Sequence, residues 1–525
     1  MRAIAALVPL AALACKTAVR PTARAETPSS ANAGPTDTGP PPSEPAPPPP
    51  QPFAVIATIS DLAVVALDAP AFAQLSHDQR LDALRASQTA AAMDAAAMDY
   101  GHTLGIVRML RAILSRPAVV PPQLLPRIRD FARAVYLNRG VHDVETRRKL
   151  VPPFSMAELR IAALAAQAAG ADFALPGAKL EFALRALEGP FFDPRVDPQR
   201  PRSEPRSSES LPEAAAPLEL VPFSGRLFIG IADEERSHPL AALAQLSASQ
   251  NRPVPAAEAL QLTGGAGPLP AFGFALPGRV ALFAAAADAL DKVRTAGALS
   301  ALADPALASD LLRCLPQHRL AQLALREVIG RQSEGLDATL DEARADLVAH
   351  VLAADPRLRE LGLLSARCQQ LWPQFAATLW FLSQAHLPSG ERIEEERQRA
   401  TQLELWWFTG KGALSERHEA GRRFLSADPA RFQKAASELL ALLQDIAASR
   451  DLVRLRDLLE SHASKLDAQW RNDVIARLRA AGIPRRVALL PPRLEPVLIE
   501  GKEIDAQARP VEDFDAGILR EWAAF

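Results

Sequence analysis

The stretch ALREVIGRQSEG, residues 324–335, contains two arginines that bracket a Glu-Val-Ile-Gly core. Arg326 and Arg331 stand five residues apart, and Glu327 directly follows the first of them. Helices that hold a catalytic zinc ion commonly place two histidines four residues apart, with a glutamate after the first to activate water, and the present spacing is one residue longer. The stretch therefore resembles a metal-binding helix in which both metal ligands have been exchanged for arginine.

Three motifs in this order resemble the dipeptidyl peptidase III family of zinc peptidases. The family's zinc helix reads H-E-x-x-G-H, and residues 326–331 read R-E-V-I-G-R, so only the two histidines differ. The family's third ligand is the second glutamate of E-E-C-R-A-E/D, which corresponds to Glu342 in DEARAD, residues 341–346. Residues 391–412, ERIEEERQRATQLELWWFTGKG, resemble the helix whose histidine assists the transition state, and Arg397 stands at that histidine's place.

The resemblance covers most of residues 60–190 and 320–525, with the matches in the family's order. It includes YLNRGVHDVETRRKLVPPF, residues 136–154, near the N-terminus. Residues 200–300 match poorly, and the family's stretch bearing a transition-state tyrosine has no recognisable counterpart there. The resemblance implies a two-lobed fold, a largely helical lobe with the zinc site and a lobe with a small β-barrel core, and peptide binding in the cleft between them.

The hydrophobic pattern predicts a mainly α protein with a minor β part. Apolar residues recur at helical spacing before residue 190 and again after residue 304, whereas RLFIGIAD, residues 226–233, and GRVALF, residues 278–283, predict short strands. The alternation near the C-terminus predicts a hairpin followed by a short helix. We divide the chain into five segments. The first two are a signal peptide with a lipobox (1–15) and a disordered Pro/Ala-rich tether (16–53). They are followed by an N-terminal lobe (54–300) with a loop at 190–222, a helical lobe with the degenerate zinc-site helices (301–490), and a C-terminal hairpin and tail that return to the first lobe (491–525).

Arginine cannot replace histidine as a zinc ligand. Zinc takes a neutral imidazole, a thiolate or a carboxylate, whereas a guanidinium group stays protonated and offers no lone pair. Glu342 is then the remaining ligand-type residue of three, and Glu327 has no metal-activated water to deprotonate. We therefore expect no zinc or other cofactor, and no peptidase activity by the family mechanism.

Three interpretations of the arginines stay open. In the first, guanidinium groups at 326, 331 and 397 compensate the buried carboxylates Glu327 and Glu342 that once faced a metal, and hold two helices together. In the second, arginine accumulated by neutral drift, favoured by GC-rich codons. In the third, the cluster binds an anionic ligand such as a peptide carboxylate or a phosphate.

The nine histidines supply no replacement pair at four- or five-residue spacing. His318 and His350 are isolated in the sequence, and we expect them to be surface or capping groups. RHEAGRR, residues 417–423, begins like a zinc motif but continues with arginines, so we expect a solvated helix face. These residues offer no alternative metal site.

The N-terminus predicts export and a lipid anchor. Residues 1–15, MRAIAALVPLAALAC, combine one arginine, a short apolar run and small residues before Cys15, as in a bacterial lipoprotein signal. The alternative is an ordinary signal peptide whose cysteine has no role. The proline-rich residues 16–53 favour extended polyproline II and would act as a spacer. We expect a protein of the bacterial cell envelope, held at the periplasmic side of the outer membrane or at the cell surface by its lipid alone.

The composition limits the fold size and the kinds of partner that we expect for this chain. The chain has 525 residues, 48% of them hydrophobic, which is enough to bury a large core in two or more lobes. A formal net charge of −2 gives no electrostatic footprint for nucleic acid. Three cysteines, at 15, 314 and 368, are too few for a disulfide framework and fit no zinc knuckle.

The sequence therefore favours a catalytically inactive, zinc-free relative of dipeptidyl peptidase III in the cell envelope. Such a protein would bind peptides in the inter-lobe cleft or act as a scaffold. The alternative is an active dipeptidyl peptidase or other hydrolase that uses an altered site. A purely structural envelope role is the third interpretation.

Overall fold

The computed structural model describes residues 53–98, 103–143, 148–174, 179–196, 217–223, 226–243, 246, 254–265, 267–330, 336–387, 393, 395–419 and 421–523. The predicted signal peptide, the tether up to residue 52, Cys15 and Arg331 lie outside these residues. None of the helices among these residues combines the length and the hydrophobicity of a membrane-spanning segment.

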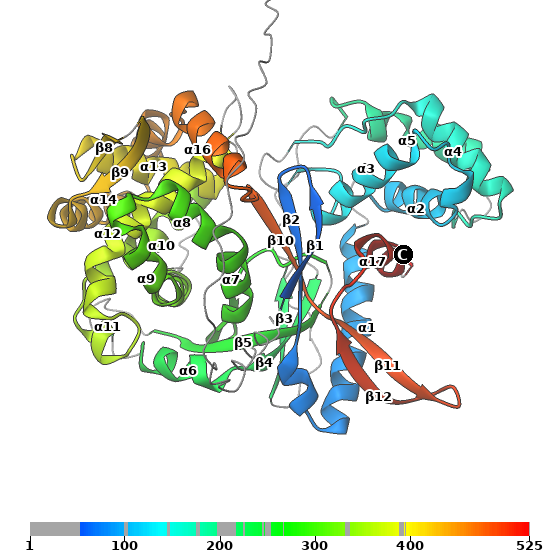
Figure 1. The fold of residues 1–525 in the computed structure, drawn as a ribbon, viewed down its shortest axis with the longest axis horizontal. Coiled ribbons are helices and arrows are strands. Elements are labelled where there is room, and N and C mark those ends of the chain that lie inside the picture. Colours follow the sequence, from blue (N-terminus) through cyan, green and yellow to red (C-terminus); the bar gives the residue numbers. More distant parts are fainter. Residues whose placement is uncertain are drawn as a thin grey trace, which may run out of the picture. The chain divides into compact units, whose positions relative to one another are not determined.

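A three-stranded sheet joins the first described residues to a segment near the C-terminus (Figure 1). Strand β2 (Leu62–Leu67) pairs antiparallel with β1 (Phe53–Ile59) and parallel with β10 (Arg486–Leu490). Side chains alternate between the two faces of β2. Val64 belongs to one hydrophobic core and Val65 to another, so this strand separates two cores.

A five-stranded mixed sheet has the strand order β3-β4-β5-β7-β6, in which β5 and β7 are parallel and the other pairs antiparallel. Its strands are β3 (Leu218–Phe223), β4 (Arg226–Ala232), β5 (Ala256–Gly265), β6 (Gly273–Leu276) and β7 (Arg279–Leu282), and helix α6 (Glu234–Ala241) packs on β5. Strands β4 and β7 coincide with the two strands predicted from the sequence. Strand β6 is an edge strand and contacts the segment that follows α9.

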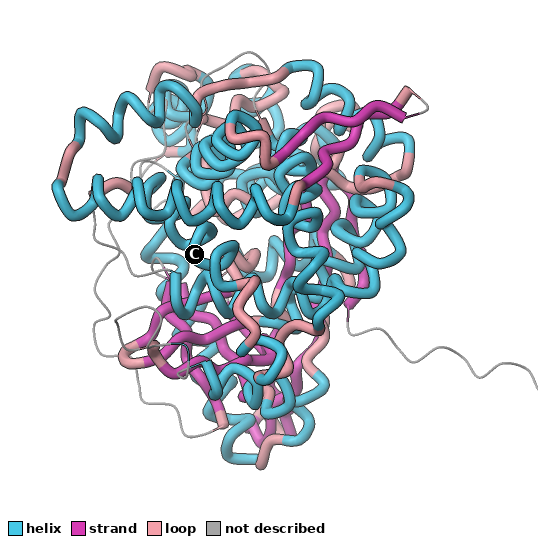
Figure 2. The backbone as a smooth tube through the Cα atoms, turned by 90° about the vertical axis from the view of Figure 1, so that its left-hand side faces the viewer, coloured by secondary structure: helices cyan, strands magenta, loops and turns pink. Residues whose placement is uncertain are grey.

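Helices form the largest hydrophobic core. Figure 2 shows the predominance of helix along the chain. The elements of this region are α7 (Ala284–Leu290), η4 (Asp291–Thr295), α8 (Ala296–Leu302), α9 (Pro305–Leu323), η5 (Ala324–Gly330), α10 (Ala338–Leu352), α11 (Arg357–Glu360), α12 (Ala366–Ser383), η6 (Gln384–His386), α13 (Glu396–Gly410), β8 (Leu414–Glu419), β9 (Arg422–Ala427), α14 (Pro429–Ser449), α15 (Leu452–Leu458), η7 (Leu459–Ala463) and α16 (Ala468–Ala480). The predicted class, mainly α with a minor β part, is confirmed.

A second helical core includes residues from both ends of the described chain. Its elements are α2 (Thr103–Leu114), α3 (Leu125–Leu137), α4 (Met156–Ala168), α5 (Leu180–Phe192) and the C-terminal α17 (Phe514–Trp522). A capping box between Ser155 and Glu158 starts α4. Trp522 is fully buried here, and the Tyr136 hydroxyl donates to Glu521 at 2.5 Å. The C-terminal helix is therefore packed against helices from near the N-terminus.

Two of the remaining N-terminal elements, η1 (Pro70–Gln74) and α1 (His77–Met98), contact the sheets, and the third, η2 (Pro117–Val119), contacts α4. Helix α1 packs on β4 and on β12 (Lys502–Arg509), which pairs antiparallel with β11 (Arg493–Ile499) in the hairpin predicted from the C-terminal alternation. Glu500 and Gly501 turn this hairpin with φ angles of 50° and 77°, as a two-residue turn of the primed type requires.

Two sequence predictions are wrong in detail. RHEAGRR does not lie on a helix: its described residues form the end of β8, the turn and the start of β9 in an antiparallel pair. Arg417, Glu419 and Arg422 are exposed there, so only the predicted solvation is correct. Of the predicted loop 190–222, residues 190–192 belong to α5 and residues 218–222 to β3, while 197–216 lie outside the described residues.

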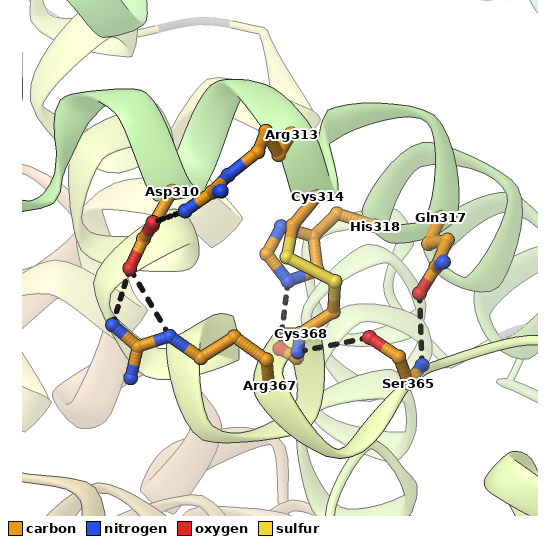
Figure 3. The surroundings of a disulfide bond; sticks show 8 residues. All are labelled: Asp310, Arg313, Cys314, Gln317, His318, Ser365, Arg367 and Cys368. Carbon is orange, nitrogen blue, oxygen red and sulfur yellow. Dashed lines mark hydrogen bonds and ion pairs between the residues drawn. A yellow bond between two sulfur atoms is a disulfide. The ribbon is translucent and has the colours of Figure 1, made fainter.

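A disulfide bond joins Cys314 on α9 to Cys368 in the first turn of α12 (Figure 3). Their Cα atoms lie 5.4 Å apart, across a sequence separation of 54, and each residue is buried. A count of three cysteines does not predict such a bond. On the exposed side, Arg313 and Arg367 both pair with Asp310, so ionic and covalent links connect the same two helices.

Candidate functional site

The arginine-bracketed stretch begins as a π-helix. The segment η5 (Ala324–Gly330) continues directly from α9 and has the wider i→i+5 hydrogen-bond pattern. Turns of π-helix inside longer helices are frequent at functional sites.

Gly330 allows η5 to touch α10. A Cβ atom on Gly330 would lie 2.6 Å from the carbonyl oxygen and 2.8 Å from the Cα atom of Ala345. Any side chain there would collide with helix backbone, which cannot move aside as a flexible side chain can. The glycine of the R-E-V-I-G-R motif thus permits a close contact between the two elements that carry the motif acids.

Helix α10 presents Glu342, Asp346 and His350 at intervals of four residues, and therefore on one face. Its N-cap is Asp337, whose side chain accepts hydrogen bonds from the first amides of the helix. Asp346 and His350 were not assigned to the site from the sequence. The i, i+4 relation to Glu342 was the signal that could have identified both.

The Arg326 guanidinium lies among three carboxylates. Its Nε donates to Asp346 Oδ1 at 2.5 Å, its Nη1 donates to Glu327, and its Nη2 donates to Glu342. The residue is 3% exposed, and the Glu342 and Asp346 side chains are 19% and 12% exposed. All three guanidinium nitrogens are thus engaged, and one cation joins η5 to α10. We call Arg326, Glu327, Glu342 and Asp346 the arginine cluster.

Electrostatics favour the charged forms of Arg326 and Asp346. Burial alone would lower the pKa of Arg326, but the charges of Asp346, Glu327 and Glu342 together raise it above its ordinary value. Burial would likewise raise the pKa of Asp346, yet the positive charges of Arg326 and then Arg397 lower it below its ordinary value. Removal of the central cation from such a buried set typically costs about 3–5 kcal/mol, because the carboxylates that remain are left uncompensated.

Arg397 supplies a second positive charge to this region from α13. Its backbone N–H is capped by the Glu395 side chain at 3.1 Å, which fixes the start of the helix. The same positive charge opposes the rise in the pKa of Glu395 that burial causes. The structure therefore brings Arg326, Glu327 and Glu342 together and places the charge of Arg397 in the same region, while Arg331 lies outside the described residues.

Uncharged groups surround the arginine cluster on the α12 and α13 side. Glu404 is fully buried and accepts from Trp380 Nε1 at 3.1 Å. Burial and then the charge of Asp346 raise its pKa well above the ordinary value, which favours the protonated acid. His350 Nδ1 accepts from Trp372 Nε1 at 3.1 Å, and burial lowers the pKa of this histidine to about 4.

The predicted exposure of His318 and His350 is wrong. They are 0% and 4% exposed, and both rings contact Trp372 in edge-to-face geometry. An isolated histidine has no sequence pattern that reports its burial. These two imidazoles pack as neutral aromatic groups in the helical core.

Glu327 lies against the five-stranded sheet. A Cβ atom on Gly273 of β6 would collide with Glu327 Cγ, so the bare backbone of this edge strand covers the glutamate side chain. Glu327 is 8% exposed, and one of its oxygens accepts from Arg326. A general base must reach the proton it removes. This carboxylate is instead covered by β6 and bonded to a cation.

The side chains of the arginine cluster do not fit a zinc ion. Zinc requires lone-pair donors, and Arg326 presents N–H donors only. The Glu342 carboxylate, at the family's third ligand position, accepts from that guanidinium. The arrangement is that of an internal ion-pair network, and we derive no metal-dependent step from it.

Comparison with known proteins supports the fold. No protein-family model and no curated protein matches the chain. The structure of dipeptidyl peptidase III from Caldithrix abyssi matches with a TM-score of 0.50 and 12% identity, over 79% of this chain and 96% of that chain. The dipeptidyl peptidase III structure from Corallococcus sp. strain EGB matches with a TM-score of 0.46 and 14% identity, over 74% and 92%. The Caldithrix likeness shows a two-lobed dipeptidyl peptidase III-like fold, and at such identity it shows the fold alone.

Proposed function

We propose that this chain is a catalytically inactive, zinc-free relative of dipeptidyl peptidase III that binds peptides or acts as a scaffold in the bacterial cell envelope. One observation carries the proposal: the Arg326 guanidinium donates to three carboxylates, two of which stand at the family's positions for the general base and the third zinc ligand. The positive charge of a metal is replaced by that of a side chain.

The chemistry of the arginine cluster supports the absence of hydrolysis. Peptide hydrolysis by the family mechanism needs a water molecule acidified by zinc and a carboxylate free to take its proton. Here Glu342 and Glu327 are both bonded to Arg326, and β6 covers Glu327. Of the three interpretations of the arginines, this pairing favours charge compensation, because drift would not require one guanidinium to bond to all three acids.

The pairing also argues against an anion site centred on Arg326. Its three nitrogens already donate to carboxylates, and the residue is 3% exposed. An incoming carboxylate or phosphate would have to displace an internal acid and then lie beside it. Like charges at that distance repel, so the internal pairing is the preferred state.

An envelope location is supported by two features that are independent of each other. Residues 1–15 and the proline-rich stretch after them have the composition of a lipoprotein signal and tether, with Cys15 as the lipidated residue. The Cys314–Cys368 disulfide is typical of proteins exposed to an oxidising compartment. The peptide partner of the proposal comes from the fold, since the solved structures that share it are peptidases.

Hydrolysis of a dipeptidyl-naphthylamide by the purified chain tests the proposal. We expect no release above the uncatalysed rate, with or without added Zn²⁺. Release that a chelator abolishes, that Zn²⁺ restores and that Glu327→Gln removes would overturn the proposal and establish the hydrolase. Binding of an unlabelled peptide to the same preparation, measured by calorimetry, distinguishes a peptide-binding protein from a scaffold.

A further inference from the structure

A second cluster of ligand-type side chains lies on the same helical run as the arginine cluster. In the described part of the chain, Cys314, His318 and Cys368 each bring one donor atom to within 4.8 Å of the other two. Cys314 and His318 stand four apart on α9, and Cys368 comes from the first turn of α12. Their exposed fractions are 3%, 0% and 3%, so the group is sealed from solvent. We call these three residues the thiol–imidazole cluster.

The hydrogen bonding of His318 leaves one ring nitrogen available as a ligand. Nε2 lies 2.8 Å from the Cys368 carbonyl oxygen, and because a carbonyl can only accept, Nε2 carries the proton. Nδ1 then carries the lone pair, and this buried atom has no hydrogen-bond partner among the described residues. A buried polar atom without a partner costs about 1–3 kcal/mol and requires an explanation.

Such an arrangement is typical of a metal-ligating histidine. These histidines usually donate their other ring N–H to a backbone carbonyl or a carboxylate, which fixes the tautomer and the ring orientation. Burial lowers the pKa of His318 to about 4, so the ring is neutral at physiological pH. Phe375, at 4.5 Å between ring centroids, and Trp372 hold the imidazole in place.

The sulfur atoms are joined in the structure and become ligands when the bond is reduced. A dithiol reductant would supply two electrons and two protons, giving two thiols and its own disulfide. Cys368 lies at the N-terminus of α12, with its amide bonded to the N-cap Ser365 at 3.3 Å. A helix N-terminus favours the thiolate, which is the form that binds metal.

We propose that Cys314, His318 and Cys368, with the disulfide reduced, form a buried site for one thiophilic divalent cation of the Zn²⁺ class. On binding, the two thiols release two protons, and the cation takes two thiolates and the imidazole nitrogen. Two sulfurs and one nitrogen are a ligand set that zinc accepts, with a fourth position open. The disulfide and the cation are therefore alternative occupants of the thiol–imidazole cluster.

This inference goes beyond the proposed function and does not depend on it. It does affect how metal content is interpreted, because zinc found in the reduced protein would belong to sulfur ligands rather than to the arginine cluster. The two sites are distinguishable by spectroscopy. Thiolates give a cobalt complex an intense near-ultraviolet charge-transfer band, and the arginine cluster contains no sulfur.

The test is an anaerobic titration of the full chain with Co²⁺, before and after reduction by a phosphine that binds metals weakly. The reduced chain should bind about one Co²⁺ with a thiolate charge-transfer band that Zn²⁺ then displaces, whereas the oxidised chain should give no band. Cys368→Ser should abolish the band. His318→Ala, which keeps both thiols, should weaken Co²⁺ binding by about tenfold or more. Cys15→Ser, the matched control, should leave the band and the affinity for Co²⁺ unchanged.

A reduced wild-type chain that gives no thiolate band at excess Co²⁺ would overturn the inference. So would a band of unchanged affinity in His318→Ala, since that result would assign binding to cysteines alone. The comparison of oxidised with reduced wild-type protein needs no substitution. It therefore stays informative even if a variant fails to fold, and circular dichroism at each step verifies the fold.

Discussion

Two cross-links connect the same helical run, α9 with η5, to its neighbours by different chemistry. The disulfide joins Cys314 to α12 covalently, and the arginine cluster joins Arg326 to α10 by ion pairs. The first responds to redox conditions and is indifferent to pH near neutrality. The second is indifferent to reductants and depends on every charge being present. The difference shows how one helical core can be held by a bond that a reductant can open and by a set of charges that mutation or acid can disrupt.

The largest expected effect comes from removing the central cation. Arg326→Met should lower the free energy of unfolding by about 3–5 kcal/mol, because Glu327, Glu342 and Asp346 are left buried without compensation. Urea unfolding at pH 7, followed by circular dichroism, measures this. Arg313→Met is the matched control, since Arg313 is 78% exposed and pairs at the surface, and it should leave the unfolding midpoint nearly unchanged. Equal effects of the two variants would contradict the account.

Opening the covalent link should have the next largest effect. Cys314→Ser/Cys368→Ser should lower the free energy of unfolding by about 2–4 kcal/mol, because the cross-link spans a sequence separation of 54 and restricts the unfolded chain. A reductant should destabilise the wild-type chain similarly and leave the double variant unaffected. Added Zn²⁺ should restore part of the stability of the reduced wild-type chain only. A wild-type chain indifferent to reductant in urea unfolding would show that the bond contributes nothing.

A smaller loss is expected from one acid of the arginine cluster. Glu342→Ala removes one charged hydrogen bond but leaves Arg326 paired with Glu327 and Asp346, so we expect about 1.5–3 kcal/mol of destabilisation. Thermal unfolding of the variant beside the wild-type chain measures it. An unchanged melting temperature would count against the cluster as a link between η5 and α10.

The smallest expected effect concerns pH. The pKa of His350 is lowered to about 4 by burial, whereas an unfolded histidine titrates near 6.5. Between these values the unfolded chain binds a proton that the folded chain excludes, so stability falls as the pH falls from about 6.5 toward 4. His350→Gln, whose amide oxygen can accept from Trp372, should reduce this slope by at most about 1.4 kcal/mol per pH unit. Glu404, whose raised pKa acts in the opposite direction, is present in both chains. An unchanged slope would show that His350 is not the group responsible.

Several structural features could be predicted from the sequence. The strands at RLFIGIAD and GRVALF and the C-terminal hairpin were predictable, because alternation and apolar runs report local structure directly. The grouping of Arg326 with Glu327, Glu342 and Arg397 followed from the resemblance together with charge compensation. Asp346 is the last residue of the DEARAD motif, and its position four residues after Glu342 places it on the same helical face. It was nevertheless not assigned to the site from the sequence.

Other features had no local signal. The burial of His318 and His350 depends on which aromatic side chains the tertiary fold brings around them. The sequence next to an isolated histidine does not indicate whether its side chain is buried or exposed. Cys314 and Cys368 are separated by 54 positions, and no spacing rule pairs cysteines at that distance. The contact of Gly273 with Glu327 joins the edge strand of a sheet to a helix. It depends on the tertiary fold, so the sequence near either residue does not predict it.

The central claim is that the Arg326 guanidinium has taken the place of a metal, and zinc stoichiometry tests it most directly. In Cys314→Ser/Cys368→Ser, where the thiol–imidazole cluster can no longer compete, the account predicts no retained zinc after equilibration with Zn²⁺ and gel filtration. The same chain with Arg326→His/Arg331→His, which restores the ligand types of the family motif beside Glu342, should retain about one equivalent. One equivalent of zinc bound to nitrogen and oxygen ligands in the parent double variant would contradict the account.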